Sequence, residues 1–320
     1  MYFTTNHLVF SLAVFFSGLL CSNCRKDTLV EQVQPANMYL DFERSVEPFQ
    51  HMPSRPVDPD AKNNGCLNPV AWNQFYDFNV CIASTCEVSD YAIERSDKYA
   101  RNGDASVRFF LKPTPLAKWP LGEASHRAEL GPRYNAPLNR YPLVGQERWY
   151  GMSVLFPEDF VFAPSNLESD LRFSIAQWQH GSEGSPIFAL EVYGDQIAVA
   201  RHKGESTSSQ WIEPQFIGQI QRGKWLDLVV QIKWSKQDGS IRVWVDGEKK
   251  YDHSNIQTVY SNLDNGGGWK LGIYYWRWLE KQNVIRSLDN GIDHREIFID
   301  EVREYLGADG LPVVTPGRSF

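Results

Sequence analysis

Short segments that alternate apolar and polar residues recur along most of this chain, and they constrain its fold more than any other feature. Turn residues such as Gly, Pro, Asn and Asp separate them, which is typical of β-strands. The segments expected to be strands are 106–111, 127–130, 149–156, 171–179, 187–193, 196–202, 225–234, 241–245, 269–275 and 296–304. Asp246-Gly247 follows one of them directly and predicts a hairpin turn. Because long amphipathic helices are not evident, we predict an all-β antiparallel sandwich of the jelly-roll, concanavalin-like class, with a concave cleft.

Composition bounds the size of the fold and its partners. The chain has 320 residues, of which 42% are hydrophobic, so it can bury a full core. No repeat or second-domain boundary is visible, and we predict one domain over residues 38–320 behind a polar tether at 25–37. A net charge of −7 argues against a nucleic-acid partner, since such proteins usually carry a basic face. Aromatic residues make up 13% of the chain, and these suit both a sandwich core and the apolar faces of sugars.

The amino terminus has the pattern of an export signal. Residues 8–20 form an apolar run of signal-peptide length, too short to span a bilayer comfortably. Cys24 follows the small polar residues Ser22 and Asn23, which resembles the lipidation site of a bacterial lipoprotein. We therefore predict a signal peptide at 1–24 and a protein held at the outer membrane or cell surface, touching the membrane only through lipid on Cys24. Ordinary secretion or periplasmic export with an unmodified cysteine is the alternative.

The remaining cysteines are Cys66, Cys81 and Cys86. An exported chain meets an oxidising compartment, so one disulfide and one leftover thiol are expected, and the sequence does not choose the pair. The spacings typical of structural zinc sites do not occur. We predict no metal site and no cofactor, and leave structural calcium open.

The segment 269–275 carries the clearest two-residue period. Trp269, Leu271 and Ile273 are apolar and would face the core, whereas Lys270 and Tyr274 would share the opposite face. The glycine at 272 lies on that same face, where it would leave room for a ligand. An ordinary half-exposed strand has the same pattern, so this segment alone does not predict a site.

A second polar cluster lies far upstream. Arg127 and Glu129 are two residues apart and share one face of their strand. Arginine can hold a carboxylate with two parallel hydrogen bonds, and Glu129 would orient it. A structural ion pair within the sheet is the alternative.

The third cluster is Gln177-Trp178-Gln179-His180. In a regular strand Gln177 and Gln179 share one face, and Trp178 and His180 share the other. A β-bulge at Trp178-Gln179 would bring His180 to the side of Gln177, and bulges are frequent beside active sites. Without a bulge, one of the pair must leave the cleft, so the role of His180 depends on whether a bulge occurs here.

Taken in order, the three clusters resemble the signature strands of jelly-roll alginate lyases. Residues 127–130 resemble the R-x-E-L strand, 175–181 the Q-x-H strand and 270–274 the K-x-G-x-Y strand. The Gln-Trp/His-Gly segment followed by Pro186 is more similar to the glucuronan lyase and heparin lyase I-like group, which shares the fold. The resemblance covers residues 105–305. Gly131 stands where the alginate lyase pattern has a second arginine, and Gln179 stands where a strict Q-x-H has its histidine.

The resemblance implies a polysaccharide lyase that cleaves a uronic-acid polysaccharide such as glucuronan or alginate by β-elimination, leaving 4,5-unsaturated ends. Arg127 and Gln177 would neutralise the sugar carboxylate. Tyr274 would be the central proton-transfer residue, with His180 as base or charge neutraliser. The cation that assists Tyr274 would be Lys270 or Arg127.

Further contacts to an anionic polysaccharide are expected along the cleft. Gln179, Lys270 and Glu129 would complete the catalytic surface. Arg201 and Lys203 alternate on one strand and could meet carboxylates of neighbouring sugars, although a solvated face has the same pattern. Trp276 and Trp278 would continue the Tyr274 face and stack on sugar rings, with core packing as the alternative.

Two other functions fit the same fold. One is a carbohydrate-binding lipoprotein without catalysis, since fold alone does not decide function. The other is a glycoside hydrolase, which needs two carboxylic acids in one cleft. The nearest acidic pair, Asp300-Glu301, lies in the last predicted strand. We favour the lyase, because a binder needs no paired proton donor and acceptor, and we expect a monomer.

Overall fold

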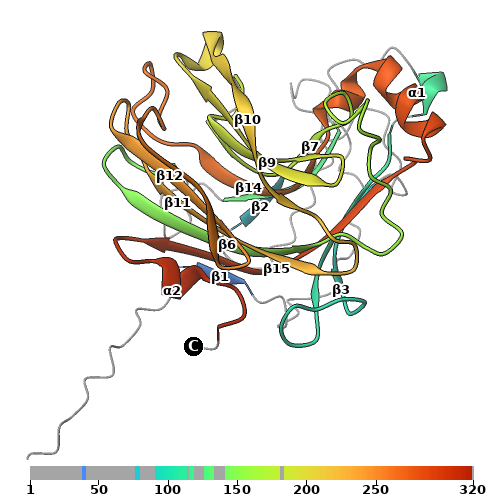
Figure 1. Cartoon of the computed structure of the whole chain (residues 1–320), viewed down its shortest axis with the longest axis horizontal. Helices are drawn as coiled ribbons and strands as arrows, with labels where there is room; N and C mark the ends of the chain where they lie inside the picture. Colours follow the sequence, from blue (N-terminus) through green and yellow to red (C-terminus); the bar gives the residue numbers. More distant parts are fainter. Residues whose placement is uncertain are drawn as a thin grey trace, which may run out of the picture. The chain divides into compact units, whose positions relative to one another are not determined.

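The computed structural model describes residues 38–40, 76–79, 91–113, 115–118, 126–132, 141–180 and 184–318. All of them belong to one compact unit, Val33–Phe320. The predicted export signal, tether, lipidation site Cys24 and disulfide cysteines lie outside the described residues. Two antiparallel sheets pack face to face (Figure 1), so the predicted jelly-roll sandwich is confirmed.

One sheet has eight strands in the order β13-β12-β11-β6-β15-β4-β3, with β1 also paired to β15. Its strands are β1 (Met38–Leu40), β3 (Tyr91–Ser96), β4 (Ser106–Leu111), β6 (Glu147–Leu155), β11 (Trp225–Lys233), β12 (Gly239–Val245), β13 (Glu248–Ile256) and β15 (Arg295–Leu306). The turn between β12 and β13 is the predicted Asp246-Gly247 hairpin, and both residues have positive φ as such turns require.

The other sheet has seven strands in the order β10-β9-β8-β7-β14-β5-β2. Its strands are β2 (Tyr76–Asn79), β5 (Arg127–Pro132), β7 (Phe173–Gln179), β8 (Phe188–Tyr193), β9 (Gln196–Lys203), β10 (Gln210–Gln219) and β14 (Gly268–Tyr274). Neighbours β7, β14 and β5 are far apart in the sequence, and their pairing is what assembles the candidate site.

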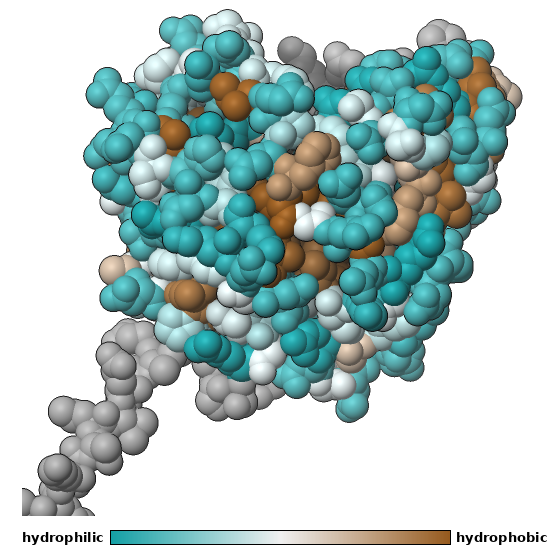
Figure 2. Space-filling model, in the orientation of Figure 1, coloured by the Kyte–Doolittle hydropathy of each residue, from teal (hydrophilic) through white to brown (hydrophobic). Residues whose placement is uncertain are grey.

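The helical elements are short. They are η2 (Leu116–Lys118), η3 (Ser206–Ser208), η4 (Trp276–Leu279), α1 (Lys281–Asp289) and α2 (Leu311–Val314). Within the part of the chain that the structure describes, no helix is long and apolar enough to cross a membrane. The face seen in Figure 2 is mainly hydrophilic, with apolar groups interspersed among the polar ones.

Large aromatic side chains fill the space between the sheets. Trp178 and Trp269 are cross-strand neighbours on β7 and β14, and their rings stack with centroids 6.0 Å apart. Tyr150 from the eight-stranded sheet meets both tryptophans edge-on, at 5.2 and 5.1 Å. Because strand side chains alternate, residues next to these tryptophans point away from the core. We call that side of the seven-stranded sheet its outer face.

Candidate active site

The three polar clusters lie side by side on the outer face. β14 pairs with β5 on one edge and with β7 on the other, so that Tyr274 lies opposite Arg127 and Lys270 lies opposite Gln177. The structure therefore brings together the arginine, amide and phenol that the sequence patterns singled out.

A hydrogen bond joins the two strands that flank β14. The amide Nε2 of Gln177 on β7 donates to Oε1 of Glu129 on β5 over 2.5 Å, passing across the strand between them. Gly272 is the residue of β14 opposite Glu129. Oε2 of Glu129 lies 3.3 Å from Nη1 of Arg127, so Glu129 orients the arginine and the amide together.

The glycine at 272 serves the core rather than a ligand. Its φ is +124°, a conformation that side chains rarely adopt. A Cβ there would point inward, 2.3 Å from the backbone oxygen of Ala128 and 2.8 Å from the ring of Phe109. The prediction that Gly272 makes room for a ligand is therefore wrong, because a side chain there would enter the core and not the outer face.

The guanidinium of Arg127 lies over the ring of Tyr274, with its Cζ 4.1 Å from the ring centroid. Trp276, at the start of η4, is tilted against the phenol ring at 5.5 Å between centroids. Tyr274 and Trp276 are both half-buried, so the phenol contacts a cation and an indole while staying partly accessible. This arrangement can stabilise negative charge that develops on Tyr274 oxygen during proton transfer.

Lys270 is at the other end of the strand from the phenol. Its Nζ donates to Oε1 of Gln179 over 3.0 Å, and four residues of β14, on the order of 13 Å, separate it from Tyr274. Of the two cations predicted to assist Tyr274, Arg127 is the one in contact with it.

The comparisons with known proteins agree with this geometry. A family model described as polysaccharide lyase matches residues 68–303. The chain belongs to this polysaccharide lyase family. No curated protein sequence matches it.

Solved structures that are similar to this chain include several carbohydrate-active enzymes. The endo-β-1,4-glucuronan lyase of the fungus Trichoderma reesei is 19% identical, with a TM-score of 0.58 over 77% of this chain and 99% of that one. A family 7 alginate lyase is 12% identical, with a TM-score of 0.45 over 66% and 84%. The glycoside hydrolase family 131 catalytic domain of Coprinopsis cinerea is 13% identical, with a TM-score of 0.45 over 79% and 95%. At 19% identity the glucuronan lyase shares the fold, and nothing about substrate follows from that alone.

The bulge that would turn His180 toward Gln177 does not occur at Trp178-Gln179, where the pairing with β14 is continuous. The register shifts lie further along, between Leu271 and Tyr274 of β14 and between Ser174 and Ala176 where β7 pairs with β8. Positive φ at a glycine gives β14 its extra residue, which no apolar–polar pattern reveals.

His180 consequently stays on the core side of its strand. Its ring is stacked with Tyr141 at 6.1 Å and tilted against the core residue Tyr260 at 6.0 Å. Burial lowers the pKa of His180 to about 4, partly opposed by a hydrogen bond with Asn265. It lies beyond Gln179, at the end of β7 remote from Tyr274. Its role as the base of the lyase remains a prediction that this geometry does not favour.

Two of the predicted sugar contacts lie on the core side of their elements. Trp278 is fully buried, stacks on Tyr275 at 4.0 Å and donates from Nε1 to the hydroxyl of Ser287. The strand ends at Tyr274 and η4 turns Trp278 inward, so the prediction that it continues the Tyr274 face is wrong.

Arg201 also turns inward. It is the cross-strand neighbour of the core residue Phe188, and it hydrogen-bonds Tyr251 of β13 in the other sheet. Lys203 alternates with Arg201 on the same side and is exposed. The outer-face position on β9 belongs to His202, whose Nδ1 lies 2.9 Å from the carbonyl oxygen of Pro186.

The sequence patterns missed a second polar group on the outer face. Arg172, directly before β7, pairs with the buried carboxylate of Glu191 on β8. Tyr193 on β8 donates its hydroxyl hydrogen to Oε2 of Glu191 over 2.9 Å. Glu191 and Tyr193 are two residues apart on one strand, which is the same signal that marked Arg127 and Glu129.

His126 is a further imidazole beside the site that was not predicted. It precedes Arg127, and its carbonyl oxygen accepts a hydrogen bond from the backbone nitrogen of Tyr275. Its ring meets Trp278 edge-on at 5.8 Å, and burial lowers its pKa to about 4. It is therefore neutral near pH 7 and packs on the core side of the strand.

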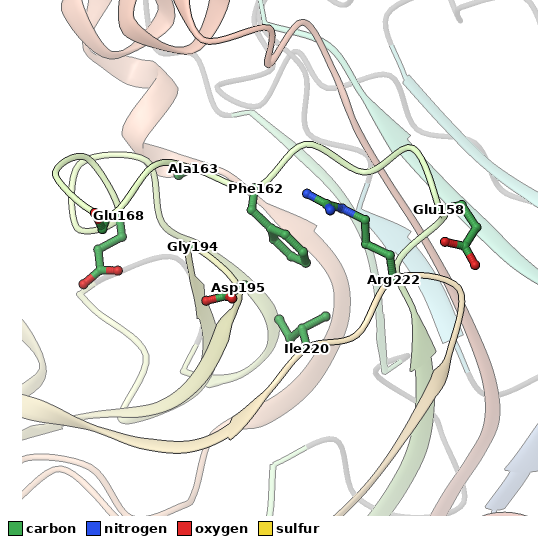
Figure 3. Close-up of a pocket in the computed structure, with 9 residues that line it drawn as sticks. Glu158, Phe162, Ala163, Glu168, Gly194, Asp195, Ile220 and Arg222 are labelled. Atoms are coloured by element: carbon green, nitrogen blue, oxygen red, sulfur yellow. The ribbon is translucent and has the colours of Figure 1, made fainter.

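A separate pocket of about 580 Å³ opens at the end of the β8–β9 hairpin. Its lining residues are Glu158, Phe162, Ala163, Ser165, Glu168, Gly194, Asp195, Ile220 and Arg222 (Figure 3). None of them is a predicted catalytic residue. Across the described residues, no group of three or more His, Cys, Asp or Glu side chains is placed to hold a metal ion.

Proposed function

We propose that this lyase cleaves a uronic-acid-containing polysaccharide by β-elimination, with Tyr274 as the proton-transfer residue. The observation that carries the proposal is the contact of Arg127 with Tyr274, together with the Gln177–Glu129–Arg127 network beside it. These groups place a fixed cation, a neutral amide and a phenol side by side, with the phenol half-buried and Gln177 fully buried.

The difficult step is removal of the C5 proton from a uronate whose carboxylate is ionised. Strong hydrogen bonds to that carboxylate stabilise the enolate-like charge that develops when the proton leaves. Arg127 can supply two parallel donors, and the Gln177 amide donates without titrating. Glu129 fixes both groups in place before substrate arrives.

Tyr274 is suited to act as both base and acid. After the C5 proton has been taken, the C4–O4 bond breaks, a double bond forms between C4 and C5, and O4 receives a proton. A single phenol near both atoms can move the two protons in turn, so that the net reaction only splits the chain and creates the double bond. The charge of Arg127 over the ring stabilises the ionised phenol between these two transfers.

The acidic residues favour a lyase over a hydrolase. Asp300 and Glu301, the nearest acidic pair that a hydrolase could use, are fully buried in the eight-stranded sheet. Asp300 accepts a hydrogen bond from the backbone of Arg101, and Glu301 is paired with Arg303. Buried in this way, neither carboxyl group is available to a sugar.

Export and a lipid on Cys24 are proposed with this function, since a polymer substrate is met outside the cell. Labelling the full-length protein with a radioactive fatty acid in a bacterial host tests this part. Incorporation in the wild type and its loss in Cys24→Ser are expected. Equal labelling of both would contradict lipidation at Cys24.

The substrate is tested by incubating the protein with glucuronan first, because of the shared fold, and then with alginate, other glucuronic-acid glycans and glycosaminoglycans. The ultraviolet absorbance of a 4,5-unsaturated uronide is followed together with new reducing ends. We expect both signals to rise together on at least one polymer. Reducing ends without the ultraviolet band would indicate hydrolysis, and binding without either signal would indicate a carbohydrate-binding protein.

A further inference from the structure

A row of four aromatic rings with one arginine at its centre crosses the outer face from Tyr274 toward the edge strand β10. Trp276 adjoins Tyr274, and the guanidinium of Arg172 lies 5.5 Å from the ring of Trp276. The same guanidinium lies 5.5 Å from the ring of Tyr193, which in turn meets Phe216 edge-on at 5.5 Å. Each member touches the next, so the row is continuous from the phenol outward.

Two of the three nitrogens of the Arg172 guanidinium contact oxygen atoms of the protein. Its Nη1 donates to the carbonyl oxygen of Ser169 over 2.6 Å, and its Nε lies 3.3 Å from Oε2 of Glu191. Its Nη2 has no hydrogen-bond partner among the described residues. The side chain of Arg172 is 21% exposed, against 7% for Glu191, so the guanidinium forms the accessible part of the pair.

Glu191 positions the arginine. Its carboxylate is buried at the centre of the group and accepts the hydroxyl hydrogen of Tyr193. Burial raises the pKa of Glu191, and the charge of Arg172 opposes that shift. Leaving such a carboxylate without its arginine would be unfavourable, which keeps Arg172 near the sheet and limits its range of conformations.

The outer end of the row is apolar and open. Phe216 lies on the edge strand β10 and is 44% exposed, so it is not part of the core. Trp276 beside the cation is half-buried and Tyr193 is buried, so Trp276 and Phe216 are the rings that a ligand can reach. Accessible rings near a fixed cation match a uronate sugar, which has apolar ring faces and one carboxylate.

We propose that Arg172, positioned by Glu191 and flanked by Trp276 and Tyr193, binds the carboxylate of a uronate that neighbours the scissile unit. This subsite rests on the proposed function, and it adds that the lyase selects a charged unit beside the cleaved one. The polymer then runs along the row from Tyr274 toward Phe216.

The test measures binding of an oligoglucuronate, long enough to cover both sites, to full-length protein carrying Tyr274→Phe so that the ligand is not consumed. Adding Arg172→Ala is expected to weaken the calorimetric Kd at least about tenfold, the usual effect of losing a charge-assisted hydrogen bond. Adding Arg172→Lys should give an intermediate Kd, because the charge remains and the planar fork is lost. With the methyl-esterified oligomer, Arg172→Ala and its parent should bind alike.

Arg242→Ala is the matched control, because Arg242 is a half-buried arginine paired with Asp252 in the eight-stranded sheet. It should leave the Kd unchanged. Thermal melts identify any variant that fails to fold. If Arg172→Ala does not fold, Arg172→Gln replaces it, and the same weakening of the Kd is expected. An unchanged Kd for the oligoglucuronate, or an equal loss with the methyl ester, overturns the subsite.

The two proposals fail in different ways. If wild-type protein releases no unsaturated uronide from any polyuronate, the proposed function is wrong. If the wild type cleaves and Arg172→Ala binds the charged oligomer as well as its parent does, only the subsite is wrong.

Discussion

Two arginine–glutamate pairs in this protein have the same spacing and opposite surroundings. Arg127 and Glu129 are two residues apart on β5, and Glu301 and Arg303 are two residues apart on β15. The first pair lies on the outer face of the seven-stranded sheet, where Arg127 covers Tyr274. The second pair is completely buried in the eight-stranded sheet.

The buried pair fastens the end of the chain. Arg303 donates from Nη1 to the carbonyl oxygen of Thr315 and from Nη2 to that of Arg318, and Glu301 accepts from the backbone nitrogen of Gly317. Its charges are therefore matched entirely by protein groups. Arg127 differs because one face of its guanidinium is given to a phenol that solvent and substrate can reach.

An arginine and a glutamate two residues apart on a strand therefore predict an ion pair, but this spacing does not predict what the pair does. What surrounds the pair decides whether it stabilises the fold or serves a reaction. Variants at the two arginines should therefore separate stability from activity.

The largest effect on stability is expected from Arg303→Ala. Removing one partner of a buried ion pair leaves Glu301 uncompensated and costs about 3–5 kcal/mol. Urea unfolding should show this loss, while kcat per folded molecule stays at the wild-type value. A stable Arg303→Ala protein with low activity would reverse the assignment of the two pairs.

Arg127→Lys should act in the opposite manner. The charge stays beside Glu129 while the planar donors to the sugar carboxylate are lost, so kcat/KM should fall about 10²-fold. The urea midpoint should move little. Arg303→Lys is the matched control and should keep its kcat/KM even if it unfolds more easily.

Gly272→Ala tests the geometry that links the flanking strands. The alanine must adopt φ near +124° with its Cβ against Ala128 and Phe109, so a loss of about 2 kcal/mol is expected. Denaturant unfolding measures it, with Gly247→Ala as the comparison because nothing lies within 4 Å of a Cβ there. If Gly272→Ala unfolds at the same denaturant concentration as the wild type, the Cβ at position 272 does not point into the core.

The smallest effect concerns pH. Burial lowers the pKa of His180 to about 4, below the 6.5 of an exposed imidazole, so the unfolded chain takes up the proton first. The stability from this residue is therefore present above pH 6.5 and lost as pH falls toward 4. Burial raises the pKa of Asp300 to about 7, and its contribution has the opposite sign, being lost as pH rises toward 7.

The difference in melting temperature between the wild type and His180→Gln, followed against pH, isolates the contribution of His180 to stability. Melting temperatures of His180→Gln should depend less on pH between 4 and 6.5 than those of wild type. His294→Gln, at a histidine whose side chain is 41% exposed, is the comparison variant. A parallel pH dependence in wild type and His180→Gln would show that His180 titrates normally.

The strands that the sequence patterns missed are mostly at sheet edges. β3 and β13 end the eight-stranded sheet, and β10 ends the seven-stranded sheet. β13 reads Glu-Lys-Lys-Tyr-Asp-His-Ser-Asn-Ile and buries only Tyr251, so it carries no alternating apolar pattern. Edge strands need fewer apolar residues, and charged residues on them discourage pairing with other chains. An apolar–polar pattern therefore does not identify such strands.

The central strands show why part of the site could be predicted. Alternation in β14 and β5 fixes which side chains share a face, and it placed Tyr274 and Arg127 together once the strands paired. The orientation of His180 depended on whether a bulge occurs at Trp178-Gln179, and the pairing with β14 is regular there. Arg172 and Glu191 were missed because their pairing joins two strands and neither strand carries both residues.

The most direct test of the account is the ultraviolet time course of Tyr274→Phe on a polyuronate that the wild type cleaves. General acid–base groups contribute roughly 10²–10⁴-fold, and the account predicts a loss of at least this size while calorimetric binding of the polymer persists. Tyr305→Phe, the same change in the eight-stranded sheet, should behave as wild type. Release of unsaturated uronide by Tyr274→Phe at near wild-type rate would contradict the assignment of Tyr274 as the proton-transfer residue.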